Sequence, residues 1–300
     1  MALKQIKNKI VATKKTGKVT KAMESVSAVK MRKSQERAFL SRPYVLGAVS
    51  ILERLIAGTR DTAHPLLSER AGERVLAVIV TSDKGLAGSV NSAVLKQAER
   101  LFKAELAVDV IAFGRKAVEF SRREGKTLIA EFTNVADGVT LADVEAAANL
   151  LLTTYTEGSY KEAVIIHQNF ISTFEQAPTL RHVLPLRAES VHQIALDIAP
   201  RVGKYSDRVG TTATPQEYTI EPSAEVVLGI LIPQLVQVVL YHALLESKAS
   251  EHSARMVAMK NATDKSKEVV KALTIKFNKQ RQAAITAEVS EITAGVEAMK

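Results

Sequence analysis

The stretch best suited to chemistry is TSDKGLAGSVN at residues 81–91, a glycine-containing segment between a β-rich run and a helical one. A loop of this kind can present backbone N–H groups to a phosphate or another anion. The stretch lacks the GxxxxGK(S/T) and GxGxxG patterns, and no acidic residue of the Walker type can be placed with it. We therefore interpret Gly85 and Gly88 as permitting a tight strand-to-helix turn, in which Asp83 and Asn91 accept hydrogen bonds from local N–H groups.

The other residues capable of catalysis are scattered along the chain. The histidines occur singly, with neither an HExxH motif nor a triad spacing: His64, His167, His182, His192, His242 and His252. The carboxylates of Glu288 and Glu291 would share one helix face, as they would on any solvated helix. Cysteine is absent, which removes disulfides and cysteine zinc sites, and no apolar signal segment is seen at the start. We therefore expect a reducing, cytoplasmic setting, with no catalytic residue, no metal and no cofactor.

Positive charge is concentrated at one end of the chain. The formal net charge is +9, and residues 1–42 contain 12 Lys or Arg against 2 Glu, so the remaining residues are close to neutral in sum. Such a segment suits phosphates, anionic lipid or an acidic protein surface, and equally a plain solvated helix face. The basic residues concerned are Lys14, Lys15, Lys18, Lys21, Lys30, Arg32 and Lys33. Nucleic-acid binding is the weaker alternative, because aromatic residues make up only 5% of the chain and no recognition motif is present.

Two long helices are expected to position these residues. Residues 246–300 contain no Pro and only Gly295 near the end, which predicts one helix about 80 Å long, far longer than a globular helix. Residues 2–57 also read as a helix, with Pro43 expected to kink or break it and Gly58 to follow its end. Between residues 13 and 34 small side chains fill most seam positions, which allows close helix contact.

The middle of the chain alternates β-rich and helical runs. Strands are predicted at 75–82, 108–114, 127–132 and 161–172, with an edge strand at 179–186. Helices are predicted between them at 91–105, 115–124 and 140–157. This alternation is typical of a mostly parallel, Rossmann-like sheet.

Four segments follow from these patterns: a helix at 1–58, the Rossmann-like domain at 74–186, an irregular connection at 187–222, and a helical segment at 223–300. In the last, Ser223 is expected to cap a short helix, and Pro233 to open the first turn of the long one. Residues 226–245 carry no formal charge and are long enough to cross a membrane. Pro233, Gln234 and His242 are poor residues for contact with lipid, so a buried helix pair is expected instead.

The end of the C-terminal helix carries an apolar stripe with steps of four and three residues. Its members are Ile285, Val289, Ile292, Val296 and Met299. If the two long helices pair in antiparallel fashion, the C-terminal helix extends at least about 15 Å beyond its partner. An apolar tip without an intrachain partner predicts a sleeve formed by another protein.

Four stretches resemble one known family. KVTKAMESVSAVKMRKSQ (18–35) with SRPY (41–44), TSDKGLAGSVN (81–91), LLESKASEHSARMVAMKNATD (244–264) and NKQRQAAITAEVSEITAG (278–295) are similar to signatures of the γ subunit of rotary F-type ATP synthases. The resemblance extends over the whole chain. It implies an α/β chain whose terminal segments form a long antiparallel coiled coil with an inserted Rossmann-like domain. It also implies a non-catalytic rotor, turned by proton flow inside a ring of α and β subunits.

The resemblance also implies roles for particular residues. Acidic loops of the β subunits would meet Lys21, Met23, Lys30, Arg32 and Lys33. Polar contacts to β that change with rotor angle would involve Arg255, Gln282, Thr286 and Glu288. The apolar stripe would turn in an apolar bearing. Where relatives continue Asp-Asn-Ala, Asp264, Lys265 and Ser266 stand here, and we expect them on an exposed face.

The implied partners are the α, β and ε subunits and the membrane c-ring, on the cytoplasmic face of a bacterial membrane. Membrane contact would occur only through the complex, and nucleic acid would not be bound. Two alternatives remain from the residues alone: a nucleotide-binding Rossmann enzyme with helical arms, and a basic coiled coil that binds nucleic acid. Tight ATP or NAD binding by the isolated chain would favour the first, and salt-dependent binding to DNA or RNA the second.

Overall fold

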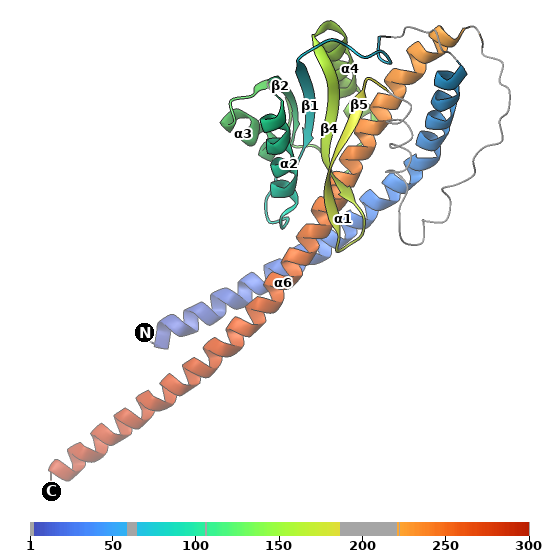
Figure 1. Cartoon of the computed structure of the whole chain (residues 1–300). Helices are drawn as coiled ribbons and strands as arrows, with labels where there is room; N and C mark the ends of the chain where they lie inside the picture. Colours follow the sequence, from blue (N-terminus) through green and yellow to red (C-terminus); the bar gives the residue numbers. More distant parts are fainter. Residues whose placement is uncertain (1–2, 59–64, 106, 187–220, 222, 300) are drawn as a thin grey trace. The chain divides into compact units, whose positions relative to one another are not determined.

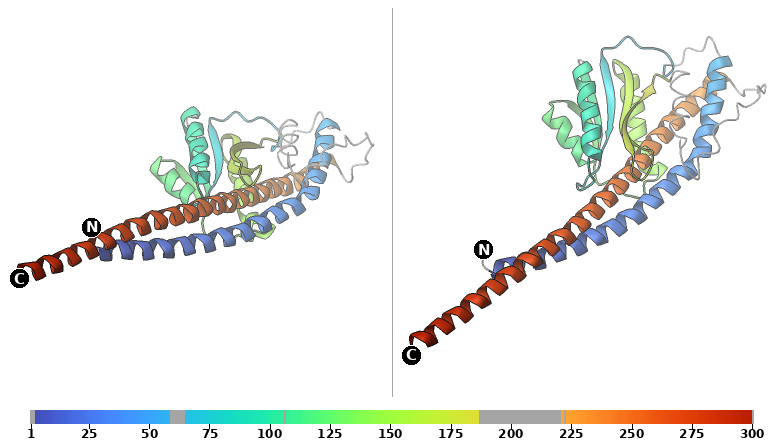
Figure 2. Two further views of the ribbon diagram at one scale, coloured as in Figure 1. Left: turned by 90° about the horizontal axis from the view of Figure 1, so that it is seen from below. Right: turned by 60° about the horizontal axis from the view of Figure 1, so that its bottom comes forward.

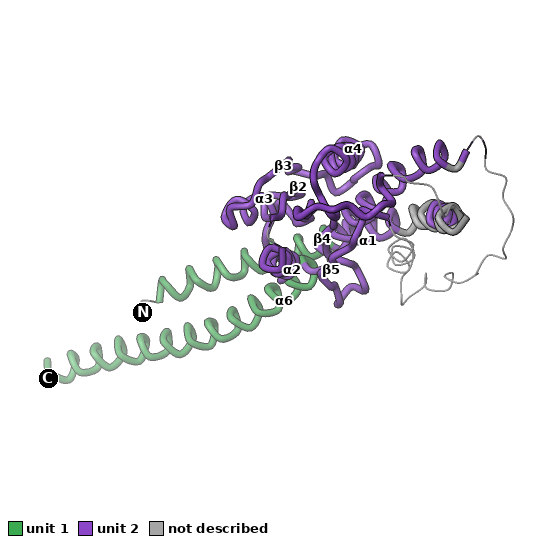
Figure 3. The backbone as a smooth tube through the Cα atoms, turned by 45° about the horizontal axis from the view of Figure 1, so that its top comes forward, with its two compact units in different colours: residues 1–27, 255–300 green, residues 28–254 purple. Residues whose placement is uncertain are grey.

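The computed structural model describes residues 3–58, 65–105, 107–186, 221 and 223–299. The predicted connection at 187–222 lies outside the described residues, apart from Glu221. The chain divides into two compact units: unit 1 comprises residues 1–27 and 255–300, and unit 2 comprises residues 28–254 (Figure 3). Both long helices, α1 (Leu3–Gly58) and α6 (Ala224–Ala298), contribute to both units.

Unit 2 contains a five-stranded sheet (Figure 1). Its strands are β1 (Arg74–Val80), β2 (Ala107–Phe113), β3 (Thr127–Phe132), β4 (Tyr160–Phe170) and β5 (Gln176–Leu184). The order is β3-β2-β1-β4-β5, with β1 to β4 parallel and β5 antiparallel to β4 at one edge. The helices between strands are α2 (Val90–Ala104), α3 (Arg115–Arg123) and α4 (Leu141–Glu157). The predicted mostly parallel sheet with one edge strand is confirmed.

The sheet is covered on both faces, as its continuous apolar runs require. Six successive residues of β1, from Val75 to Val80, are buried. Alternate side chains along β1, such as Val75 and Ile79, pack in one core with apolar residues of α2 and α3. Those between them, such as Leu76 and Val78, pack in a second core with residues of α4, the first part of α6 and the C-terminal part of α1.

The C-terminal segment is one helix rather than the predicted short helix followed by a long one. Helix α6 runs for 75 residues and includes Pro233 in its interior. A proline inside a helix costs about 3 kcal/mol. Here Leu228, Ile232 and Leu235 are fully buried on either side of the proline, so their packing outweighs this cost. Ser223 does cap the helix, since its Oγ accepts a hydrogen bond from the N–H of Val226 at 3.4 Å.

Within the described residues, helix Glu225–Ala298 is long and apolar enough to span a membrane, judged by length and composition alone. Half of its most apolar 18-residue window is buried inside the protein. Residues 235, 236, 238, 239 and 240 belong to the core beside the sheet. The expected burial is therefore confirmed for the second half of this run, whereas Val226 and Ile230 in its first half are exposed. The run lies in one helix and not in a pair.

Helix α1 continues through Pro43, so the proline does not break it. The helix axis changes direction in its C-terminal part instead, which agrees with the predicted kink (Figure 2). A proline removes one backbone hydrogen bond and its ring displaces the preceding turn, and bending accommodates both effects.

In unit 1 the two long helices run antiparallel and side by side (Figure 2). Thr20 Oγ1 lies 2.7 Å from Thr263 Oγ1, and a Cβ built on Gly17 would lie 3.2 Å from Cβ of Ser266. The predicted close seam of small residues is confirmed at these pairs. Ser266 is half-buried against Gly17, so the expectation of an exposed face holds for Asp264 and Lys265 but is wrong for Ser266.

Candidate functional site

The glycine loop after β1 uses its polar groups within the fold. Asn91 Oδ1 accepts a hydrogen bond from the Ser82 N–H at 3.0 Å, and Asp83 Oδ1 accepts one from the Arg115 N–H at 3.1 Å. Gly88 has a φ of +59°, a conformation that costs glycine little. The structural interpretation of this loop is confirmed for Gly88 and Asn91. It is wrong for Gly85, since positive φ occurs at Leu86 instead, and for Asp83, whose partner Arg115 lies at the start of α3 and not in the loop.

Replacing Asn91 by Ala tests this interpretation. The variant leaves the part-buried N–H of Ser82 without its acceptor, which should lower the free energy of unfolding by about 1 to 3 kcal/mol. Urea unfolding of the purified chain measures the loss. Ser92→Ala is a matched control, because Ser92 donates only an exposed hydrogen bond within the same helix turn. Equal effects of the two substitutions would contradict the role given to Asn91.

Two histidines that are distant in sequence meet at one carboxylate. His167 Nε2 lies 2.8 Å from Glu246 Oε2, and His242 Nδ1 lies 3.4 Å from Glu246 Oε1. The guanidinium of Arg181 approaches the same carboxylate at 3.7 Å. All four residues are buried. The expectation that the histidines occur singly is therefore wrong for His167 and His242. His252 lies 2.9 Å from Asp137, and His182 lies 2.9 Å from Glu162. His64 and His192 lie outside the described residues.

The environment of Glu246 favours its charged form. Burial alone would raise the pKa of Glu246, but the neighbouring His242, His167 and Arg181 outweigh burial and hold it well below its ordinary range. Burial and the charge of Arg181 lower the pKa of His167. With the side chain of Glu246 only 7% exposed, the cluster fastens α6 to strands β4 and β5 and is closed to substrate. Among the described residues, no group of three or more His, Asp or Glu could hold a metal ion.

The basic residues expected to meet acidic loops fall in both units. Lys21 is exposed and pairs with Glu24 at 3.0 Å, while Met23 is half-buried. Arg32 and Lys33 are exposed on α1. Such exposed cations suit attraction to an acidic partner that weakens with salt.

Lys30 differs from Lys21, because its ammonium group contacts a carboxylate that is distant in the sequence. It lies 2.6 Å from Asp137 Oδ2, in the loop between β3 and α4. No pattern in the sequence pointed to Asp137, which belongs to an ordinary turn segment, Ala-Asp-Gly.

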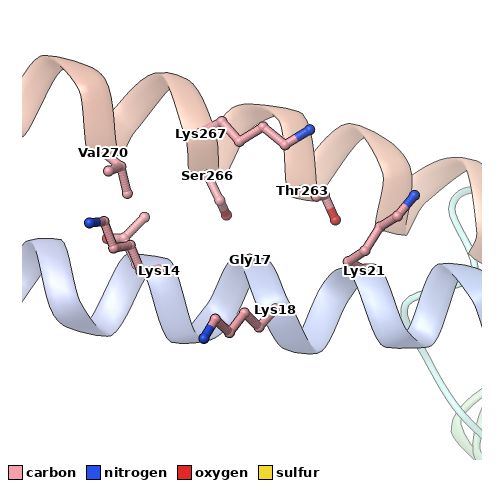
Figure 4. Close-up of a pocket in the computed structure, with 9 residues that line it drawn as sticks. Lys14, Gly17, Lys18, Lys21, Thr263, Ser266, Lys267 and Val270 are labelled. Carbon is pink, nitrogen blue, oxygen red and sulfur yellow. The ribbon is translucent and has the colours of Figure 1, made fainter.

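A groove lies between α1 and α6 in unit 1, with a volume of about 610 Å³ (Figure 4). Its lining residues come from both helices: Thr13, Lys14, Gly17, Lys18, Lys21, Thr263, Ser266, Lys267 and Val270. Lys267 is exposed and pairs with Asp264 at 2.9 Å. The groove occurs where small seam side chains, Gly17, Thr263 and Ser266, leave space between the two helices.

The last turns of α6 are exposed within this chain. The apolar stripe has exposed fractions from 50% at Ile285 to 84% at Met299. Gln282, Thr286 and Glu288 are exposed on the same part of the helix. Arg255 is different, with only 8% exposed, so its side chain belongs to this chain's own packing.

Comparison with known proteins agrees with this architecture. A family model described as ATP synthase matches residues 2–299. The chain is 36% identical over 298 residues to the ATP synthase gamma chain of Heliobacterium modesticaldum, with 99% of both chains covered.

Solved structures give the same result for the fold. The central stalk and c-ring structure of Tetrahymena thermophila mitochondrial ATP synthase contains a similar chain, with 25% identity and a TM-score of 0.59, covering 81% of this chain and 99% of that one. A chain of the Euglena gracilis mitochondrial ATP synthase shares the fold at 17% identity and a TM-score of 0.65, covering 99% and 94%. The chain therefore belongs to the family of ATP synthase gamma chains.

Proposed function

We propose that this chain is the non-catalytic central-stalk rotor of an F-type ATP synthase, coupling transmembrane proton flow to ATP synthesis or hydrolysis. The observation that carries the proposal is the exposed apolar stripe at the end of α6, from Ile285 to Met299, on a chain that matches gamma chains along its whole length. A helix end with apolar residues at coiled-coil spacing, left exposed by the described part of its own chain, requires an apolar surface on another protein.

In this role the stripe turns inside a sleeve formed by the α and β subunits. Contacts between apolar surfaces are non-directional, so they hold the tip with little preference for one angle. Polar side chains at the same level, Gln282, Thr286 and Glu288, would contact β in ways that change with angle. The exposed cations Lys21, Arg32 and Lys33 would meet acidic loops of β, while Arg255 would act through the packing of the rotor.

The remaining partners are the ε subunit and the membrane c-ring, which would turn together with this chain. The protein would lie at the cytoplasmic face of a bacterial membrane as a peripheral component, in contact with the membrane through the complex. It would bind neither a cofactor nor nucleic acid.

Co-purification tests the proposal. A tagged copy expressed in its host should bring down the α and β subunits, and deletion of residues 285–300 should loosen this association in a salt wash. The matched control replaces Ser290 with Ala and Glu291 with Gln, exposed polar residues on the same part of the helix. Failure of the full-length chain to retain α and β, or tight stoichiometric ATP binding by the isolated chain, would contradict the rotor function.

A further inference from the structure

The loop between β3 and α4, residues 133–140, is held by both long helices at one carboxylate. From α1, Lys30 Nζ lies 2.6 Å from Asp137 Oδ2. From α6, His252 Nε2 lies 2.9 Å from Asp137 Oδ1. Lys248 Nζ, also on α6, donates a hydrogen bond to the carbonyl oxygen of Val135 at 2.9 Å and lies 4.0 Å from Asp137 Oδ1. All of these residues belong to unit 2.

The contacts are unequal in their exposure to water. The side chain of His252 is 4% exposed and that of Lys248 is 10% exposed, whereas Asp137 and Lys30 are 38% and 44% exposed. The hydrogen bond between Asp137 and His252 is therefore shielded from water, whereas the ion pair between Asp137 and Lys30 is exposed to water. A positive charge on the buried imidazole of His252 would attract Asp137 more strongly than a charge in an exposed ion pair, because water screens the buried charge less.

Other charged groups surround the same loop. Glu251 on α6 lies 3.8 Å from Lys248, and a Cβ on Gly138 would lie 2.9 Å from the Arg37 guanidinium of α1. Lys30 from α1 and Lys248 from α6 face Asp137, Glu251 faces Lys248, and Arg37 lies beside Gly138. Burial would raise the pKa of Asp137, but Lys30, His252 and Lys248 outweigh burial and lower it. With its pKa lowered, the carboxylate of Asp137 is ionised at neutral pH and can accept a hydrogen bond from the imidazole of His252.

We propose that Asp137 is a positioning residue that latches the β3–α4 loop to both long helices, and that the latch tightens when His252 is protonated. A neutral imidazole offers Asp137 one hydrogen bond, whereas an imidazolium offers a hydrogen bond and an opposite charge. In the rotor proposed above, such a latch would resist separation of the sheet from the two helices when torque passes between them. Its existence can be tested without any partner subunit.

Amide hydrogen exchange of the isolated full-length chain tests the latch. In Asp137→Asn the amides of residues 133–139 should exchange roughly tenfold faster or more, because a hydrogen-bonded charge has been removed from the loop. Lys30→Gln should show a smaller increase. Lys33→Gln is the matched control, since Lys33 lies on the same helix but is exposed. Amides of β1 report whether the sheet itself is unchanged.

The pH dependence tests the role of His252. After correction for the intrinsic exchange rate, the loop of the wild-type chain should be more protected at pH 6 than at pH 8. In His252→Gln this difference should disappear. Unchanged exchange in Asp137→Asn would overturn the latch, and a pH difference that persists in His252→Gln would overturn its control by protonation. Neither result bears on co-purification with α and β, so failure of the latch is distinguishable from failure of the rotor function.

Discussion

Glu246→Gln should lower the free energy of unfolding by about 3 to 5 kcal/mol, the usual cost of removing one partner from a buried ion pair. The carboxylate of Glu246 faces Arg181 at 3.7 Å and His167 at 2.8 Å, and all three residues are buried. Gln keeps the size of the side chain but removes the negative charge, so a buried guanidinium loses its facing anion. Urea unfolding of the purified chain at pH 7 measures the change.

The control for this substitution is Glu288→Gln, on the exposed part of the same helix, which should change stability little. A loss below about 1 kcal/mol in Glu246→Gln would contradict the assignment, because it would place the cluster in the range of exposed ion pairs.

The same cluster makes stability depend on pH in two windows. The pKa of Glu246 is lowered from 4.5 and that of His167 is lowered from 6.5. In each case the unfolded chain binds a proton more readily than the folded chain, so stability falls as pH falls. The contribution of His167 is complete above about pH 6.5, and that of Glu246 above about pH 4.5. Glu246→Gln should remove the contribution of Glu246 to the lower window while the upper window remains.

The cluster of His167, Arg181, His242 and Glu246 could not be predicted from the sequence, because it depends on the strand register and on how α6 packs against the sheet. Arg181 pairs with Ile165 across β4 and β5, and His167 lies two residues further along β4 on the same face of the sheet. This register places Arg181 and His167 on the same face as diagonal neighbours. The i, i+4 spacing of His242, inside the run predicted to be buried, and Glu246, directly after it, was the one local signal. The pairing of Lys30 with Asp137 likewise depends on a long-range contact between α1 and a turn.

Local sequence patterns were sufficient to predict the strands whose residues are buried without interruption. Strands β1 and β2 are buried along nearly their whole length. A buried strand of a parallel sheet is a continuous apolar run, so it can be predicted without knowing which strands lie beside it. Pro233 shows the limit of this reasoning. Its local chemistry favours a helix start, but fully buried side chains on both sides, among them Ile232 and Leu235, keep the helix intact. Tertiary packing decided the helix boundary there, and the proline did not.

Gly114→Ala should be among the most damaging substitutions in the sheet domain, with a loss of at least about 3 kcal/mol from backbone strain and overpacking together. Gly114 directly follows β2 with a φ of +83°, and an added Cβ would lie 2.3 Å from the carbonyl oxygen of Thr81. Its own N–H donates to the carbonyl oxygen of Phe132 at 2.8 Å, so it cannot shift without breaking the join between β2 and β3.

Gly125→Ala separates the two causes. Gly125 has a φ of +65°, but an added Cβ would meet nothing within 4 Å. This substitution carries the conformational cost alone, about 1 to 2 kcal/mol. Thermal and urea unfolding of the two variants should therefore differ by several-fold in the lost free energy. Equal losses would mean that positive φ, and not the backbone of Thr81, dominates at Gly114. The loop after β1 would then have room to move away from β2, contrary to the tight network of Ser82, Asp83 and Asn91 that fastens it.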